Sequence, residues 1–296
     1  MQFTEPSMRP PQEAHSLLLR ATQGCSYNAC HFCYVSRGFP FMAVKAEDLE
    51  REAQAYAPFF HPNTKVYLTG SNPFALPTQT LKDYIAALRK PFPHFSELSM
   101  QSRIDDISRK SDAELQELRN LGLAQLYIGT ENGNEAVLKL MNKGHTAAQT
   151  IEELHRLDNA GIAYTTFYVI GLGGKGRGRE SGWATAQMFN QVHPKRITTT
   201  GMTIFPNTPV ASMVQKGEFV EATEREKIEE LLIFLENLQI DTFYDGIHYL
   251  NSLHYRFANS NIQVKKHVLE DIRNTLQGYS DIELEQMVNR KAMHSL

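Results

Sequence analysis

The sequence predicts an α/β fold in which parallel strands alternate with helices. Short apolar or β-branched runs indicate six strands, at residues 16–21, 65–70, 97–102, 124–130, 163–172 and 196–205. Amphipathic segments between them indicate helices, at residues 47–57, 80–90, 112–121, 135–140, 147–160 and 180–192. Strands that are separated by helices and short connections are expected to run parallel, with right-handed crossovers. Six such units fit either an open doubly wound sheet or a partial barrel.

Several helices begin with a capping box, in which a side chain and the backbone N–H groups satisfy each other. These boxes pair Ser111 with Glu114, Thr146 with Gln149, and Thr223 with Glu226. After about residue 212 the sequence shows only helical patterns, at 223–238, 265–276 and 280–290. We therefore expect an α/β domain at residues 1–211 and a helical C-terminal extension at residues 212–296, packed on that domain.

The composition is that of an ordinary globular protein. The chain has 296 residues, a net charge of -3 and 42% hydrophobic residues, enough for a sizeable core and with no excess charge for a nucleic acid partner. No run approaches the roughly 18 apolar residues of a membrane span, and the first residues lack the features of a secretory signal. Three cysteines without an even framework favour a reducing compartment. We expect a cytoplasmic protein without a membrane partner.

The three cysteines lie within nine residues, at Cys25, Cys30 and Cys33, in the pattern C-x4-C-x2-C. Thiolates select zinc or iron–sulfur clusters, and a complete iron–sulfur ligand set normally has four sulfurs. The chain has no fourth cysteine, so either a histidine such as His31 completes a zinc site or one metal stays open. Zinc sites usually show two separated ligand pairs, which are absent from this sequence. The pattern therefore favours an iron–sulfur cluster, with His31 as a loop residue.

The position of the cysteines adds to this interpretation. They follow the first predicted strand, and ligands bind at the carboxyl ends of parallel strands in both candidate architectures. The cysteine loop is therefore expected on the ligand-binding face.

The cysteine loop and the order of the later motifs resemble the radical S-adenosylmethionine (SAM) superfamily. The usual spacing in that family is C-x3-C-x2-C, so this chain has one extra residue in the first gap, whereas Phe32 fits the family habit of an aromatic residue before the last cysteine. The segment from Tyr127 to Gly133 resembles a turn of the Elongator-catalytic-subunit and oxygen-independent coproporphyrinogen oxidase branch. The resemblance covers roughly residues 15–210 and implies a partial (β/α)6 TIM-like barrel with the helical extension.

The resemblance also implies the cofactors. Cys25, Cys30 and Cys33 would hold a [4Fe–4S] cluster, and SAM would bind the fourth iron and yield a 5′-deoxyadenosyl radical after one-electron cleavage. The implied contacts to SAM, in chain order, are Phe32, Gly70, Ser71, Asn72, Gln101, Ser102, Arg103, Glu131, Lys143, Ile170, Gly171 and Leu172.

Each group of these contacts has an implied part of SAM. The turn at residues 70–72 would receive the amino group, and Lys143 the carboxylate. Residues 101–103 would contact the ribose and residues 170–172 the adenine. Because side chains alternate along a strand, Gln101 and Arg103 are expected on one side and Ser102 on the other.

The resemblance implies an enzyme that abstracts hydrogen from a small organic substrate, leading to oxidation, rearrangement or ligation. It also implies a low-potential electron donor such as flavodoxin or ferredoxin. The sequence identifies no catalytic residue beyond the cofactor ligands. The segment at residues 245–251, with Asp245 and His248, and the nearby His254 and Tyr255, fits either a substrate or interface segment or a polar loop between helices.

Two alternative functions remain open. One is a structural or sensory zinc protein. The other is an NAD(P)-dependent oxidoreductase, because the run from Gly171 to Gly176 fits G-x-G-x-x-G after a strand. The next predicted strand lacks the acidic ribose ligand of that fold, which counts against the second alternative. The basic residues Lys175, Arg177 and Arg179 could instead hold an acidic substrate or an electron-donor protein.

Overall fold

The computed structural model describes Glu5 and residues 9–292, and it divides into two compact units. The first unit comprises Glu5 and residues 9–28, 35–128 and 156–164, and the second comprises residues 29–34, 129–155 and 165–292. This division into two units does not test the expected domain boundary between residues 211 and 212, which stays a prediction. Within the described residues, no helix is both long and apolar enough to cross a membrane.

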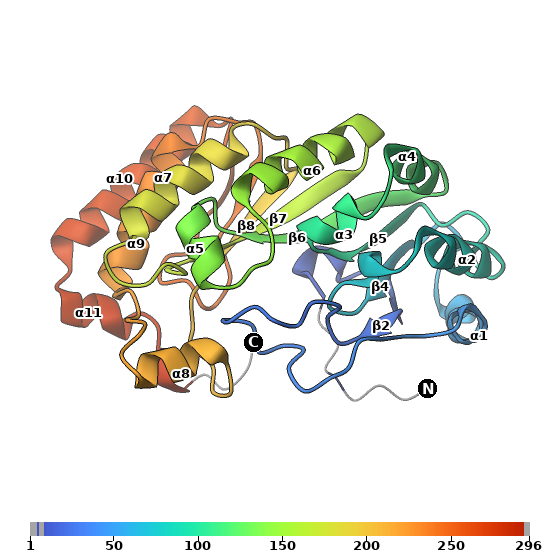
Figure 1. Ribbon diagram of the computed structural model, residues 1–296. Coiled ribbons are helices and arrows are strands. Elements are labelled where there is room, and N and C mark those ends of the chain that lie inside the picture. Colours follow the sequence, from blue (N-terminus) through green and yellow to red (C-terminus); the bar gives the residue numbers. More distant parts are fainter. Residues whose placement is uncertain (1–4, 6–8, 293–296) are drawn as a thin grey trace. The chain divides into compact units, whose positions relative to one another are not determined.

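The first unit is built on parallel strands in the order β1 (Leu17–Arg20), β4 (Lys65–Thr69), β5 (Glu97–Ser102) and β6 (Leu123–Glu131), of which residues 123–128 belong to this unit. Its helices include α1 (Ala46–Tyr56), α2 (Thr78–Arg89) and α4 (Asp112–Asn120). Helix α2 packs against both α1 and α4 (Figure 1). The predicted alternation of parallel strands and helices is confirmed here.

One face of these strands is polar although it is buried. The register places Tyr67 beside Ser99, and Gln101 beside Tyr127, on the same face. Glu13, at the end of the 3-10 helix η1 (Pro11–Glu13), is buried against this face and accepts hydrogen bonds from Ser99 Oγ at 2.8 Å and Tyr127 Oη at 2.6 Å. These hydroxyl groups satisfy a carboxylate that would otherwise be costly to bury.

The second unit is also built on strands that are mainly parallel. Strands β7 (Ala163–Ile170), of which residues 165–170 belong to this unit, β8 (Arg196–Gly201) and β9 (Phe243–Asp245) are parallel. Strand β10 (Arg256–Ala258) pairs antiparallel with β9. The expectation of helices only after residue 212 is therefore wrong, because β9 and β10 lie in that part. Each has three residues, too few to show a periodic pattern in the sequence.

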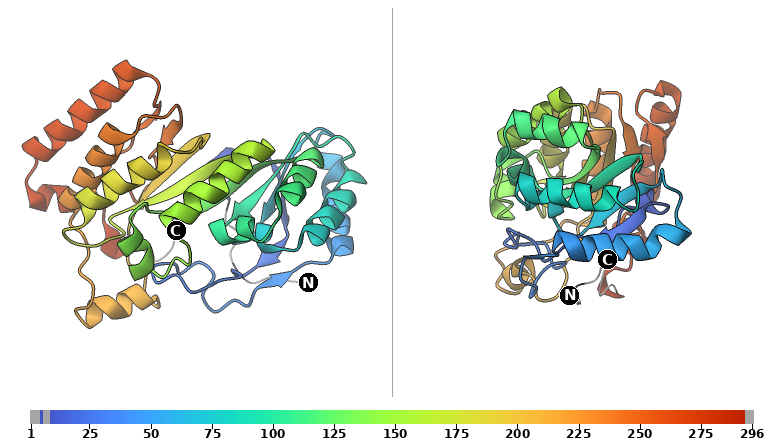
Figure 2. Two further views of the ribbon diagram at one scale, coloured as in Figure 1. Left: turned by 45° about the horizontal axis from the view of Figure 1, so that its top comes forward. Right: turned by 90° about the vertical axis from the view of Figure 1, so that its right-hand side faces the viewer.

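The helices of the second unit include α7 (Gly178–Phe189), α9 (Glu224–Asn237) and α10 (Ile262–Gly278). Helix α9 packs against both α7 and α10, as Figures 1 and 2 show. The remaining elements are β2 (Thr22–Gln23), β3 (Met42–Ala43), η2 (Ala57–Phe59), η3 (Pro73–Ala75), α3 (Ile104–Ser108), α5 (Glu135–Leu140), α6 (Ala147–Ala160), α8 (Pro209–Gln215), α11 (Asp281–Gln286) and η4 (Arg290–Ala292).

The predicted capping boxes are confirmed. The Ser111–Glu114 and Thr223–Glu226 boxes have both hydrogen bonds, and so does the pair of Thr146 and Gln149. A further box, Ser280 with Glu283, begins α11. The final helix ends at Gln286, before the predicted end at residue 290.

The contact between α7 and α9 depends on a glycine. A Cβ atom at Gly182 of α7 would lie 2.5 Å from the backbone oxygen of Glu230 in α9. Real side chains do not approach a backbone oxygen this closely, so any larger residue would push the two helices apart.

We expect Gly182→Ala to lower the free energy of unfolding by about 1–3 kcal/mol, because overpacking forces the backbone to shift. Chemical denaturation of the two proteins measures the difference. Gly278→Ala is the matched control, since a Cβ at Gly278 would meet no atom within 4 Å. Equal losses of stability in both variants would contradict the packing argument.

Candidate cofactor site

The cysteine loop is closed at its base by a short ladder. Strands β2 and β3 pair antiparallel, with Thr22 opposite Ala43, so residues 24–41 form the loop between them. Gly24 has a φ of 71°, and a Cβ there would lie 2.5 Å from the backbone oxygen of Pro40. Its N–H donates to the Glu5 carboxylate at 2.7 Å. The chain therefore makes a tight turn immediately before Cys25.

The first two residues of the long gap between Cys25 and Cys30 are held by side chains of the first unit. The Ser26 N–H donates to Asn72 Oδ1 at 3.0 Å. The Tyr27 ring lies under the Arg103 guanidinium, whose carbon is 4.1 Å from the ring centroid. Both partners, Asn72 and Arg103, are among the residues predicted to contact SAM.

The other two gap residues also have partners of their own. Asn28 adopts the left-handed conformation with a φ of 48°, and its side chain donates to the Ser36 backbone oxygen at 3.0 Å. In the second unit, the Ala29 backbone oxygen accepts from Asn142 Nδ2 at 3.0 Å. Each residue of the four-residue gap therefore has a contact of its own that anchors it.

Asn72 is fully buried, and both polar atoms of its side chain have partners. Besides accepting from Ser26, it donates to Ser26 Oγ at 2.7 Å and to Asp106 Oδ2 at 2.9 Å. Burial raises the pKa of Asp106, whereas its hydrogen bond from Asn72 lowers it. The structure thus shows Asn72 positioning the cysteine loop, and its contact with SAM stays a prediction.

Gln101 lies beside the predicted turn at Gly70 and Ser71. With its amide nitrogen facing them, Gln101 donates to the backbone oxygens of Gly70 at 3.1 Å and Ser71 at 3.0 Å. Gly70 has a φ of 139°, and a Cβ there would collide with Thr22. These three predicted residues therefore come together in the first unit.

The structure also resolves how residues 101–103 are arranged. Ser102 points to the opposite face of β5 from Gln101, and its hydroxyl donates to the Arg103 backbone oxygen at 2.8 Å. Strand β5 ends at Ser102, and Arg103 is the N-cap of α3. Strand alternation therefore does not determine the direction of the Arg103 side chain. Its Nε donates to Asp105 Oδ1 at 2.8 Å.

In the second unit, the segment that carries Cys30 and Cys33 is held through His31. The His31 N–H donates to the Met141 backbone oxygen at 2.9 Å, and its Nδ1 lies 2.8 Å from the Leu140 oxygen. The Val210 N–H donates to the His31 oxygen at 3.0 Å. The end of α5 and the start of α8 thus fix this segment. His31 is a loop residue with backbone partners, as predicted.

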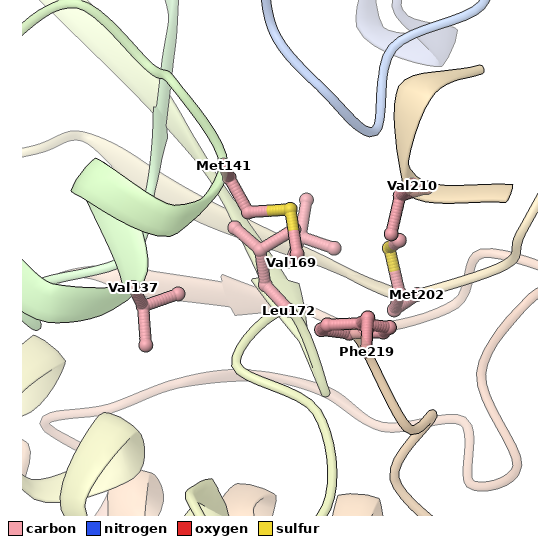
Figure 3. Packing of buried hydrophobic residues seen from close by; sticks show 7 residues of the cluster. All are labelled: Val137, Met141, Val169, Leu172, Met202, Val210 and Phe219. Atoms are coloured by element: carbon pink, nitrogen blue, oxygen red, sulfur yellow. The ribbon is translucent and has the colours of Figure 1, made fainter. Parts of the chain in front are cut away.

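Phe32 packs against a buried apolar cluster of the second unit, which Figure 3 shows. The cluster consists of Val137, Met141, Val169, Leu172, Met202, Val210 and Phe219. Leu172, a predicted adenine contact, has no exposed surface in this cluster. The Cys33 neighbour Phe32 and the end of β7 therefore share one apolar core.

Glu131 and Lys143 form a buried ion pair of 2.8 Å between Oε1 and Nζ. Glu131 adopts a left-handed φ of 66°, which turns the chain at the end of β6. The Lys143 ammonium also lies 5.9 Å from the centroid of the Phe32 ring. The structure therefore brings together three residues that the sequence predicts for SAM binding.

Helix α9 supplies a residue that the sequence analysis did not identify. Glu230 is fully buried and accepts from the Gly171 N–H at 3.0 Å and the Tyr168 hydroxyl at 2.6 Å. Burial raises the pKa of Glu230 to about 8, against smaller lowering effects from these hydrogen bonds and from Lys227. Glu230 thus fixes the end of β7, next to the predicted adenine contact at Ile170. Only the fold reveals it, because it lies 59 residues beyond Gly171.

Lys227, one turn earlier on α9, holds the end of the next strand. Its ammonium donates to the Met202 backbone oxygen at 3.3 Å and pairs with Glu221 and Glu224, each at 2.9 Å. Its alkyl chain lies so close to Gly171 that a Cβ there would be 2.9 Å from it. Gly171 is thus needed at this position.

The glycine run from Gly171 to Gly176 does not present its backbone to a dinucleotide. The Gly171 N–H is bonded to Glu230, and the Gly174 and Lys175 N–H groups donate to the backbone oxygens of Gly171 and Val220. The Gly176 N–H donates to Glu226 at 2.8 Å. A pyrophosphate cradle needs free N–H groups, so this arrangement counts against the dinucleotide interpretation.

None of the three cysteines is in a disulfide; Cys30 is buried, and Cys25 and Cys33 are half-buried. In the part of the chain that the structure describes, no group of three Cys, His, Asp or Glu side chains is already gathered to hold a metal. The donor set itself, three soft thiols on an anchored loop, fits an iron–sulfur cluster with one iron left open.

The comparisons with known proteins identify the family. The family model of the radical SAM superfamily matches residues 19–181, which is more than half of the chain and includes the cysteine loop. The chain therefore belongs to the radical SAM superfamily, and the resemblance seen in the sequence is confirmed.

Solved structures of other proteins share the fold. They include the radical SAM methyltransferase TsrM from Kitasatospora setae, with cobalamin and a [4Fe–4S] cluster bound (17% identity, TM-score 0.56, 68% of this chain and 37% of that chain). Another is coproporphyrinogen III oxidase (HemN) from Escherichia coli, a radical SAM enzyme (20% identity, TM-score 0.57, 75% of this chain and 52% of that chain). A third is Elp3 from the archaeon Methanocaldococcus infernus (15% identity, TM-score 0.53, 87% of this chain and 63% of that chain). This chain thus spans between about a third and two thirds of their lengths. The shared fold supports the predicted partial TIM-like barrel.

We expect the stability of the protein to depend on pH because burial raises the pKa of Glu230. Its pKa is raised from the ordinary 4.5 to about 8, so folding takes up a proton between these values. The stabilisation from the neutral form is fully present below about pH 4.5 and is lost as the pH rises through about 8. Relative to Glu230→Gln, the wild type should lose up to about 1.4 kcal/mol per pH unit between these limits.

Chemical denaturation at several pH values measures this difference. Glu229→Gln, the neighbouring change on α9, is the control. A constant difference between wild type and Glu230→Gln across this range would show that Glu230 does not change its protonation on folding.

Proposed function

We propose that this radical SAM enzyme holds a [4Fe–4S] cluster on Cys25, Cys30 and Cys33 and uses SAM to abstract hydrogen from a small organic substrate. The observation that carries the proposal is the family match across an anchored loop that holds all three cysteines of the sequence, none of them in a disulfide. With the cluster and SAM bound, one-electron reduction of SAM supplies the 5′-deoxyadenosyl radical. A low-potential carrier such as flavodoxin or ferredoxin would supply that electron.

The protein's own residues would hold the loop and orient SAM. The Asn72 side chain holds Ser26, next to Cys25, and backbone hydrogen bonds of His31 hold the residue next to Cys30. The Glu131–Lys143 pair would receive the charged end of SAM, with Lys143 nearest its carboxylate. The Ile170–Leu172 turn, fixed by Glu230, would lie against the adenine. Exclusion of water from such a site would protect a reactive intermediate.

The alternatives lack comparable support. A zinc site would need a further ligand, and the sequence lacks the second, separated ligand pair that zinc sites usually show. A dinucleotide site would need backbone N–H groups of the glycine run, but those of Gly171 and Gly176 are already hydrogen-bonded to Glu230 and Glu226. A cytoplasmic location and a small-molecule substrate that is oxidised, rearranged or ligated are parts of the proposal.

Anaerobic reconstitution tests the cluster. We expect about four irons per chain and 5′-deoxyadenosine on addition of SAM and dithionite. Cys25→Ser, Cys30→Ser and Cys33→Ser should each lose both, because each removes one thiolate ligand. Ser212→Ala, at an exposed position of α8, is the control. A colourless wild type that binds one zinc per chain would contradict the proposal.

The Glu131–Lys143 pair gives a second test. Lys143→Met leaves Glu131 buried without its cation and should cost about 3–5 kcal/mol of stability. Combining it with Glu131→Gln should recover much of this loss. If Lys143 binds the SAM carboxylate, the KM for SAM should rise by about tenfold or more in both proteins.

Lys139→Met is the matched control, because Lys139 is exposed on the preceding helix α5. The KM for SAM comes from the rate of 5′-deoxyadenosine formation in each reconstituted protein. A wild-type KM in the stable double variant would assign the pair a structural role only.

A further inference from the structure

Two arginines share one carboxylate on the strands β8 to β10 of the second unit. Arg196 Nη1 lies 2.6 Å and Arg256 Nη2 lies 3.0 Å from the same oxygen, Oδ2 of Asp245. The guanidinium carbons of Arg196 and Arg256 are also 4.4 and 5.9 Å from the centroid of the Phe243 ring. The two cations are thus held side by side over one aromatic ring.

The strand register places this group on the face that points away from α9. Tyr168 contacts Glu230 of α9 and lies beside Thr199, so both mark the face that α9 covers. Side chains alternate along a strand, so Arg196 and Thr198 point the other way. Thr198 lies beside Asp245, and Asp245 lies beside Arg256. All of these side chains therefore share the second face.

The group carries an excess of positive charge and of hydrogen-bond donors. Two guanidiniums have ten N–H bonds between them, whereas one carboxylate has two oxygens. Asp245 is buried, with 3% of its side chain exposed, but Arg256 is 44% exposed. Two like charges beside each other repel, and an additional anion would relieve that repulsion. Planar guanidiniums bind carboxylates and phosphates through paired hydrogen bonds.

Further polar groups continue from the arginines toward the carboxyl end of β8. The Thr198 hydroxyl is buried and has no hydrogen-bond partner among the described residues. Thr200, two residues and about 6.6 Å farther along the strand, has its hydroxyl 3.4 Å from His248 Nδ1. Asn251 ties the loop that carries His248 to the Thr199 backbone oxygen at 2.9 Å. The segment around His248, which the sequence left open, thus lies at the same end of the sheet.

We propose that this face of β8–β10 binds an anionic group of the substrate, a carboxylate or a phosphate, through Arg196 and Arg256. Asp245 positions the two arginines, and Thr198 and Thr200 contact the polar part of the substrate between the anionic group and the carboxyl ends of the strands. The inference rests on the proposed function, because ligands of this fold bind at those ends. It narrows the substrate class to a molecule with an anionic end at some distance from its reacting carbon.

Calorimetry on the reconstituted, SAM-loaded enzyme tests the site with three probes: inorganic phosphate, hexanoate and the neutral hexanamide. We expect at least one anion to bind and hexanamide not to bind. Arg256→Gln should weaken that binding about tenfold, the value of a charge-assisted contact. Asp245→Asn should strengthen it, because the arginines lose their internal partner. Arg273→Gln is the matched control, since Arg273 pairs one to one with Glu236 and should bind anions as the wild type does.

The choice of anion separates the two sources: binding of phosphate alone assigns a phosphate group, and binding of hexanoate assigns a carboxylate. The inference is overturned if neither anion binds, if Arg256→Gln and Arg273→Gln bind equally, or if Asp245→Asn weakens binding as Arg256→Gln does. The last result would mean that the ion pairs of Asp245 with Arg196 and Arg256 have a structural role only. Formation of 5′-deoxyadenosine by the wild type is measured in parallel, so a loss of anion binding alone contradicts this inference and not the proposed function.

Discussion

Hydrogen bonds hold the backbone next to the cysteines, and the proposed chemistry depends on this constraint. The tight turn at Gly24 and the Asn72 side chain hold the residues around Cys25. The bonds of His31 to the turn after α5 hold the residues around Cys30. Three thiols on a free chain would lose much conformational entropy when they bind one cluster. An anchored loop loses less, and its fourth position can stay open for a ligand.

The part of the chain after residue 212 also supports the site. Helix α9 approaches α7 closely because Gly182 lacks a side chain, and this approach brings Glu230 and Lys227 to the ends of β7 and β8. The Glu230 carboxyl group accepts from the Gly171 N–H and the Lys227 ammonium donates to the Met202 oxygen, so these buried side chains fix both ends. The same region supplies β9 and β10, on which the arginine pair lies. The sequence suggested a helical extension after residue 212. The structure shows that this part also adds two strands and holds the ends of β7 and β8.

Much of the architecture follows from local sequence patterns. Helices α5 and α6 have the predicted bounds, since a capping residue or box begins each of them. The cysteine spacing, its place after the first strand and the order of the later motifs indicated the family, which the family model confirms. Strands β9 and β10 were missed because three residues cannot show a period. The roles of Asn72 and Glu230 were missed because they depend on contacts 46 and 59 residues away along the chain, which no local pattern encodes.

The most direct test of the central claim is the electron paramagnetic resonance spectrum of the reduced, reconstituted protein with and without SAM. A cluster on Cys25, Cys30 and Cys33 has one iron without a protein thiolate, so SAM should bind that iron and shift the g values of the reduced cluster. A spectrum that SAM leaves unchanged would mean that the fourth position is closed or that SAM does not bind the cluster. Either result would contradict the account.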